Sequence, residues 1–122
     1  MEIRYKIWLE KDGKVIFGQG REKLFEAIEE CHSLNAAAKK LNMSYRAAWG
    51  RLRASEERMG VRLIESGAAK KGMTLTPAAR ALLDRFRQLE RDADAYLRKT
   101  SREISALVEG EAGSNPGSEE KN

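Results

Sequence analysis

The segment Ser33–Trp49, which reads SLNAAAKKLNMSYRAAW, decides the fold expected for this chain. Its first part is rich in alanine, which combines high helix propensity with small volume, so it predicts a short helix over residues 35–41. Ser33 or Asn35 can cap this helix by accepting a backbone N–H. A short helix of small residues can pack closely under a second helix at a steep angle, which indicates a helix-turn-helix.

The second helix of this unit is predicted to begin after Ser44, a good capping residue, and to stop at Gly60. Residues expected to face inward recur at spacings of 4, 3 and 4: Ala48, Leu52, Ser55 and Met59. The opposite face is basic, aromatic and able to form hydrogen bonds, with Arg46, Trp49, Gly50 and Arg53 on it and Ser44 and Tyr45 at its N-terminal tip. Trp49 can be interpreted either as a core residue or as part of this exposed face.

Upstream of this unit, residues Ile3–Leu9 alternate between apolar and other side chains, which predicts a strand with one buried face. The Asp-Gly pair at 12–13 is a strong signal for a tight turn, and Val15–Phe17 is predicted to return as the second strand of a hairpin. Residues 21–31 carry apolar side chains at helical spacing and predict a helix.

Downstream, short strands over 61–65 and 73–76 flank a small basic loop and predict a β-wing. Pro77 follows Thr76 at the position where proline is favoured, the first residue of a helix. Because no helix breaker occurs from 78 to 109, we expect a long C-terminal helix, and the polar residues 110–122 are expected to be a disordered tail.

The long helix carries large apolar residues at heptad-like spacing. A domain of this size cannot cover a helix of about 48 Å along its whole length, so much of this row requires a second chain. The alternative is a lone helix folded back on its own domain. The residues expected to form a dimer contact are Leu82, Phe86, Leu89, Tyr96, Leu97, Ile104 and Leu107.

The 122 residues suffice for one domain, expected over 1–109, and their net charge is +4. From Lys39 to Lys71 there are nine basic residues against three acidic ones, a local excess that favours a polyanionic partner. Nucleic acid is the first candidate, ahead of an acidic membrane, and a solvated basic face is the alternative.

Several other classes of protein are not expected. One cysteine is too few for an internal disulfide, and one cysteine with one histidine is too few for a structural zinc site. The sequence shows no pair of carboxylates of the kind that enzymes use for acid–base catalysis, so we do not expect an enzyme. The first residues lack the apolar core of a signal peptide, and no apolar run is long enough to cross a membrane, so we expect a cytoplasmic protein. We also expect that the protein uses no cofactor.

The segment 33–49, and above all its Met-Ser-Tyr-Arg-Ala-Ala-Trp stretch, resembles the winged helix-turn-helix of the molybdate-responsive ModE regulators. Residues 60–65, Gly-Val-Arg-Leu-Ile-Glu, and 75–77, Leu-Thr-Pro, resemble the wing that ModE shares with LysR-type regulators, and the likeness extends over about 8–86. The resemblance implies a DNA-binding dimerisation module. It also implies that Ser44, Tyr45 and Arg46 read the major groove with Trp49 behind them, and that Lys70 and Lys71 in the wing contact phosphate.

Two departures from the ModE pattern matter. Full ModE regulators carry C-terminal oxyanion-binding domains after the long helix, whereas this chain has a polar tail there, so we expect no molybdate site and no small-molecule ligand. His32 stands where the family usually has a glycine, which bears on the turn before the short helix.

These observations predict a mainly α fold with little β structure: a winged helix-turn-helix with an N-terminal β-hairpin and a long C-terminal dimerisation helix. The expected function is a homodimeric, sequence-specific DNA-binding transcriptional regulator that recognises a pseudo-palindromic operator. The alternative is a protein–protein interaction module of the same fold that pairs with a separate sensor subunit. The residues predicted to contact DNA are Ser33, Asn35, Ser44, Tyr45, Arg46, Trp49, Arg53, Lys70 and Lys71.

Overall fold

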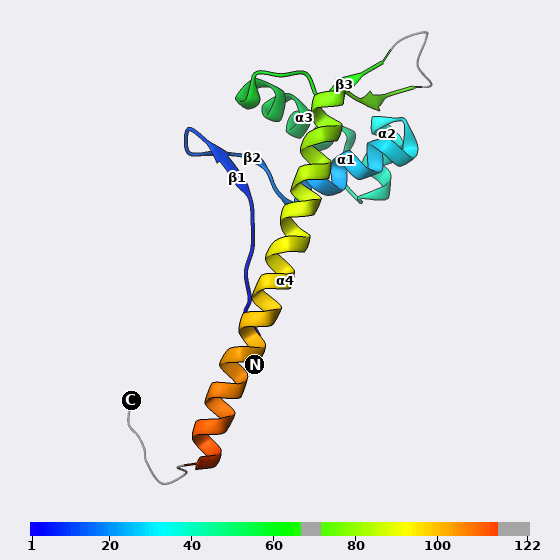
Figure 1. Cartoon of the computed structure of the whole chain (residues 1–122). Helices are drawn as coiled ribbons and strands as arrows, with labels where there is room; N and C mark the ends of the chain where they lie inside the picture. Colours follow the sequence, from blue (N-terminus) through cyan, green and yellow to red (C-terminus); the bar gives the residue numbers. More distant parts are fainter. Residues whose placement is uncertain (67–71, 115–122) are drawn as a thin grey trace. The chain divides into compact units, whose positions relative to one another are not determined.

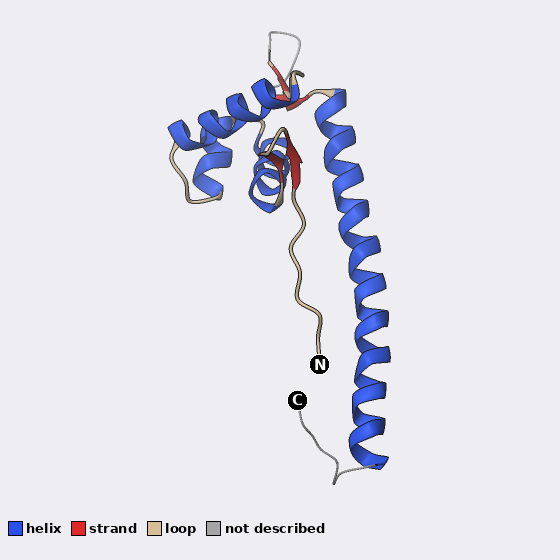
Figure 2. Cartoon of the chain, turned by 90° about the vertical axis from the view of Figure 1, so that its left-hand side faces the viewer, coloured by secondary structure: helices blue, strands red, loops and turns tan. Residues whose placement is uncertain are grey.

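The computed structural model describes residues 1–66 and 72–114, and it is mainly helical, with short strands in two hairpins (Figures 1 and 2). The elements in chain order are β1 (Leu9–Lys11), β2 (Lys14–Phe17), α1 (Gln19–Cys31), α2 (Leu34–Lys40), α3 (Tyr45–Met59), β3 (Ile64–Glu65), β4 (Thr74–Leu75) and α4 (Pro77–Ser114). Contacts within the chain define two compact units. One comprises Ile7–Arg87, and the other joins Met1–Lys6 to the part of α4 that begins at Gln88.

The N-terminal hairpin forms at the predicted turn. Asp12 and Gly13 both have positive φ angles, 52° and 77°, as the tight turns of two-residue hairpins require. β1 pairs antiparallel with β2 from Leu9 opposite Phe17 to Lys11 opposite Lys14. The prediction of a strand over Ile3–Leu9 was wrong for residues 3–8, because β2 ends at Phe17 and leaves those residues without a strand to pair with.

The caps of the helix-turn-helix are those the sequence predicts. The Ser33 hydroxyl, rather than Asn35, accepts the Ala36 N–H at 3.1 Å and caps α2, and the Ser44 hydroxyl accepts the Ala47 N–H at 3.0 Å and caps α3. His32 ends α1 in the left-handed conformation, with φ 56°. Glycine adopts this conformation most easily, and here histidine completes the turn.

The wing is shorter than predicted, since β3 and β4 have two residues each and pair antiparallel. Gly72 precedes β4 with φ +78°, and the next backbone N–H, of Met73, donates to the carbonyl oxygen of His32 at 2.9 Å. Thr76 donates its hydroxyl to the Arg62 carbonyl at 2.8 Å. The wing is therefore bonded to the end of α1 and across its own base.

The long helix begins as predicted, with Pro77 as its first residue and the Thr76 hydroxyl accepting the Ala79 N–H at 3.1 Å. It ends at Ser114 and not at Glu109. A single glycine at position 110 costs a helix only about 1 kcal/mol, which does not suffice to end it. The predicted tail therefore begins with helical residues, and its remainder lies outside the described part of the chain.

The core of the Ile7–Arg87 unit is organised around Phe17. Its ring forms edge-to-face contacts with Phe25 of α1 and Phe86 of α4, with centroids 5.0 Å apart in both pairs. The large side chains that are almost fully buried are Phe17, Leu24, Phe25, Ile28, Leu52, Leu63, Leu83 and Phe86. The hairpin, α1, α3, the wing and the start of α4 thus share one apolar core.

Candidate nucleic-acid interface

The two faces of α3 differ as the sequence predicts. Ala48, Leu52 and Ser55 are buried in the core. The opposite face leaves large side chains in solvent: Tyr45 is 53% exposed and Trp49 is 40% exposed. Trp49 is therefore a surface residue, and the Arg53 guanidinium carbon lies 5.8 Å from the centroid of its ring, within the range of a cation–π contact.

This exposed face has the chemistry that nucleic-acid recognition requires. Arg46 and Arg53 are both exposed, and neither forms an ion pair with another described residue. Their guanidinium groups can donate paired hydrogen bonds to base edges or phosphates. Tyr45 adds a hydroxyl group in the first turn of the helix, the part that enters a groove first.

Two of the residues predicted to contact DNA, Ser33 and Ser44, also cap helices. Ser33 and Ser44 both use their hydroxyl oxygens to accept backbone N–H groups at helix caps. Each hydroxyl keeps its own proton, which remains available to a phosphate oxygen. Asn35 is exposed in the first turn of α2, and Lys70 and Lys71 lie outside the described residues.

The wing is fixed to one edge of α3. Glu56 on α3 accepts the backbone N–H of Leu63, the residue before β3, at 2.9 Å. Sequence reasoning assigned no role to Glu56, which it counted only as one of the few acids in a basic stretch. The structure shows that this carboxylate positions the wing relative to the exposed face of α3.

Six of the seven residues predicted to form a dimer contact fall into two groups. Phe86 is only 2% exposed and packs against Phe17, so its assignment to a dimer contact was wrong, and Leu82 packs against the same core. The second group lies on the later part of α4 and is exposed: Leu89, Tyr96, Ile104 and Leu107. This second group keeps the apolar surface that a partner could cover.

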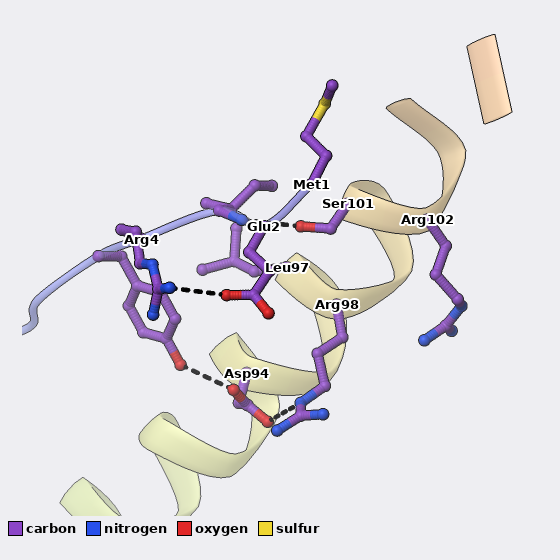
Figure 3. A pocket seen from close by; sticks show the side chains of 10 residues that line it. Met1, Glu2, Arg4, Asp94, Leu97, Arg98, Ser101 and Arg102 are labelled. Carbon is purple, nitrogen blue, oxygen red and sulfur yellow. Dashed lines mark hydrogen bonds and ion pairs between the residues drawn. The ribbon is translucent and has the colours of Figure 1, made fainter. Parts of the chain in front are cut away.

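Leu97 is half-buried, and together with the N-terminal segment it lines a pocket on α4 (Figure 3). The backbone N–H of Ile3 donates to the Ser101 hydroxyl at 3.0 Å. The Tyr5 hydroxyl donates to Asp94 at 3.2 Å, and Asp94 also accepts from Arg98 at 2.7 Å. These contacts attach the first residues of the chain to α4.

The Asp94 carboxylate accepts two donors, chiefly Arg98 and also Tyr5, so its pKa is lowered. The pKa of Tyr5 is raised, first by loss of solvent and then by the negative charge of Asp94. The sequence contained one signal for this site, the Asp-Arg pair at spacing i, i+4 on a helix. The participation of Tyr5, 89 residues away, had no signal.

Other kinds of site are not found in the described part of the chain. None of its helices is long and apolar enough to cross a membrane. Within residues 1–66 and 72–114, no group of three histidine, cysteine or acidic residues could hold a metal ion.

These elements define a winged helix-turn-helix domain. It consists of a short helix, a turn, a helix with an exposed basic and aromatic face, and a two-stranded hairpin. Residues 22–80 match the model of the bacterial regulatory helix-turn-helix proteins of the lysR family. This match confirms, for residues 22–80, the LysR-like helix-turn-helix that the resemblance in the sequence predicted. The match lies within the Ile7–Arg87 unit.

Individual relatives support the same assignment. The chain is 36% identical over 74 residues to the transcriptional regulator ModE of Haemophilus influenzae, a match that covers 58% of this chain and 29% of ModE. The chain thus spans under a third of the length of that relative. Among solved structures, it is similar to the CbnR DNA-binding domain in complex with DNA, with 31% identity, a TM-score of 0.52 and coverage of 73% of this chain and 98% of the other. It also resembles oxidised OxyR of Corynebacterium glutamicum, with 30% identity, a TM-score of 0.50 and coverage of 66% and 26%.

Proposed function

We propose that this protein is a sequence-specific DNA-binding transcriptional regulator that acts as a homodimer on a pseudo-palindromic operator. The observation that carries the proposal is the exposed face of α3, a helix capped by Ser44. This face is formed by Tyr45, Arg46, Trp49 and Arg53. The match of residues 22–80 to the helix-turn-helix of the lysR family and the likeness to a domain solved in complex with DNA support it.

In this proposal α3 enters the major groove with its N-terminal turn. Arg46 contacts a base edge, with Tyr45 and Ser44 beside it, and Arg53 reaches the groove further along the helix behind Trp49. Ser33 and Asn35 at the start of α2 contact phosphate oxygens, which accept hydrogen bonds from such groups. Lys70 and Lys71 are assigned to phosphate as well, from the sequence alone.

The dimer is proposed from the exposed apolar row on α4. Leu89, Tyr96 and Leu107 are 7 and 11 residues apart, about two and three helical turns, so they lie on one face. Tyr96 is 67% exposed and Leu107 is 72% exposed, and monomeric proteins seldom leave such rows uncovered. A second copy covers both rows by two-fold symmetry, which places two reading helices on half-sites about 34 Å apart or a multiple of that distance.

The DNA-binding part is tested by measuring the affinity of purified protein for genomic fragments and for random duplex at several salt concentrations. Arg46→Ala should reduce specific binding by about 1–3 kcal/mol, the range for a lost bidentate base contact, and leave non-specific binding nearly unchanged. Arg85→Ala is the matched control, because Arg85 is an exposed arginine on α4 without an ion pair to a described residue. An unchanged ratio of specific to non-specific affinity in Arg46→Ala would show that the groove assignment is wrong.

The dimer is tested separately by sedimentation equilibrium without DNA at micromolar concentration. We expect the mass of two chains. A mass of 13.7 kDa would refute the homodimer and with it the symmetric operator, but would leave single-site DNA binding possible.

A further inference from the structure

Three arginines, one from α1 and two from α3, lie along an edge of α3 to which sequence reasoning assigned no role. Arg51, Ser55 and Arg58 are four and three residues apart, so they form one stripe along the helix. From α1, the side chain of Arg21 donates its Nε–H to the buried Ser55 hydroxyl at 2.5 Å. Arg21 is thereby held between the helical turns that carry Arg51 and Arg58.

No carboxylate of the described residues neutralises this cluster of Arg21, Arg51 and Arg58. None of the three forms an ion pair with a described residue. The pKa of Arg21 is lowered by burial and by the positive charges of Arg58 and Arg51. Like charges held together in this way repel one another, and a bound anion would remove that repulsion.

The arginines are also held in place. A Cβ atom at Gly20 would lie 3.3 Å from Nη1 of Arg51, so this guanidinium rests against the first turn of α1. Arg58 donates from Nη1 to the carbonyl oxygen of Val15 at 2.7 Å. Arg51 itself is exposed, and it is therefore the member of the cluster best able to contact a ligand.

The position of the cluster on α3 indicates where the anion comes from. At 3.6 residues per turn, Arg51 and Arg58 lie about 140–160° around the helix from Glu56, which binds the wing. The exposed Arg46 and Arg53 lie between these two edges. A helix in the major groove has a phosphate backbone along each of its edges, so the wing and the arginine cluster would face opposite strands.

We propose that the Arg21–Arg51–Arg58 cluster binds a backbone phosphate of the operator, on the strand across the major groove from the wing. This inference rests on the proposed DNA binding and adds to it a phosphate contact on a second strand. The ligand chemistry is that of a phosphate group, and the DNA backbone is favoured over a free phosphate because the cluster borders the reading face of α3.

The test compares Arg51→Gln with Arg85→Gln, which removes one positive charge from an exposed site on α4. Binding to one specific and one random duplex is measured between 50 and 200 mM salt. Arg51→Gln should weaken both complexes alike and reduce the slope of log K against log salt by about one, whereas Arg85→Gln should leave the slope unchanged. The ratio of wild-type affinity to Arg51→Gln affinity should therefore decrease about 3.5-fold as the salt concentration rises from 50 to 200 mM.

Two further measurements separate this role from others. Thermal unfolding without DNA should give Arg51→Gln a melting temperature equal to or above that of wild type, because one repelling charge is gone; a clear decrease would indicate a structural role and overturn the proposal. Inorganic phosphate at constant ionic strength is the probe for a free anion. If phosphate stabilises wild type but not Arg51→Gln, and the DNA slopes of the two variants agree, the cluster binds a free anion and the DNA assignment is wrong.

The outcome also distinguishes this inference from the proposed function. If wild type binds no duplex at any salt concentration, the proposed function fails. If wild type binds but Arg51→Gln and Arg85→Gln behave alike, only the phosphate assignment fails.

Discussion

Replacing Gly72 with alanine should detach the wing from the end of α1. At this position φ is +78°, and a Cβ atom would lie 2.3 Å from the carbonyl oxygen of His32. That same oxygen accepts the Met73 N–H at 2.9 Å. Because a carbon and an oxygen cannot approach so closely, the chain at Gly72 must move by roughly 1 Å, and the hydrogen bond to His32 is lost.

The magnitude follows from separate contributions. Alanine in the left-handed region costs about 1–2 kcal/mol, and the lower entropy of its unfolded chain offsets about 0.4–1 kcal/mol of this. The lost backbone hydrogen bond adds about 1–1.5 kcal/mol, and the displacement of the strand adds more. We therefore expect Gly72→Ala to lower the free energy of unfolding by about 3 kcal/mol.

Gly60→Ala is a matched control, because Gly60 has φ +73° but no atom within 4 Å of its Cβ position. It should show only the conformational cost, a net loss of about 1 kcal/mol. Urea unfolding of both variants, at unchanged slope, gives the two values. Effects of independent mutations add to within about 0.5 kcal/mol. If the losses in the free energy of unfolding of the two variants agree within that margin, the contact between Gly72 and His32 has no energetic consequence, and the reasoning is refuted.

The remaining predictions concern α4. Leu107→Lys should weaken the proposed dimer by about tenfold or more in sedimentation, because burial of each leucine contributes about 1.5–3 kcal/mol to association. Glu109→Lys, at an exposed position two residues away, is the control and should leave the dimer unchanged. The pKa of Asp94, read from its carboxyl resonance by NMR, should rise more in Arg98→Gln than in Tyr5→Phe, since Arg98 is the main cause of its decrease. The stabilisation from this lowered pKa is present above the ordinary pKa of an aspartate and is lost as the pH falls through the lowered value; equal pKa values in both variants would contradict this order of causes.

Local patterns predicted the helix-turn-helix in detail. Ser33 and Ser44 cap their helices through atoms three residues away, and the Asp12–Gly13 turn is closed within four residues. Thr76 likewise caps α4 at Ala79. Such interactions depend on neighbours in the chain, so they can be inferred from residue types and spacing alone.

The face that α3 exposes was predictable for the same reason, since helical periodicity separates Ala48 and Leu52 from Arg46 and Arg53. Trp49 was not predictable, because an amphipathic aromatic residue fits both a core and a surface. The structure places it on the surface, 40% exposed and beside Arg53.

The sequence by itself determined the order of the elements, the capped helices and the exposed basic helix, because all of these arise from contacts within a few residues. Only the tertiary structure decided that residues 3–8 have no strand to pair with, that Phe86 belongs to the core beside Phe17, and that Arg21 reaches Ser55. Each of these depends on which surfaces meet across 8 to 69 positions of the chain. Periodicity shows that a helix has an apolar face, but it does not show which neighbour covers that face.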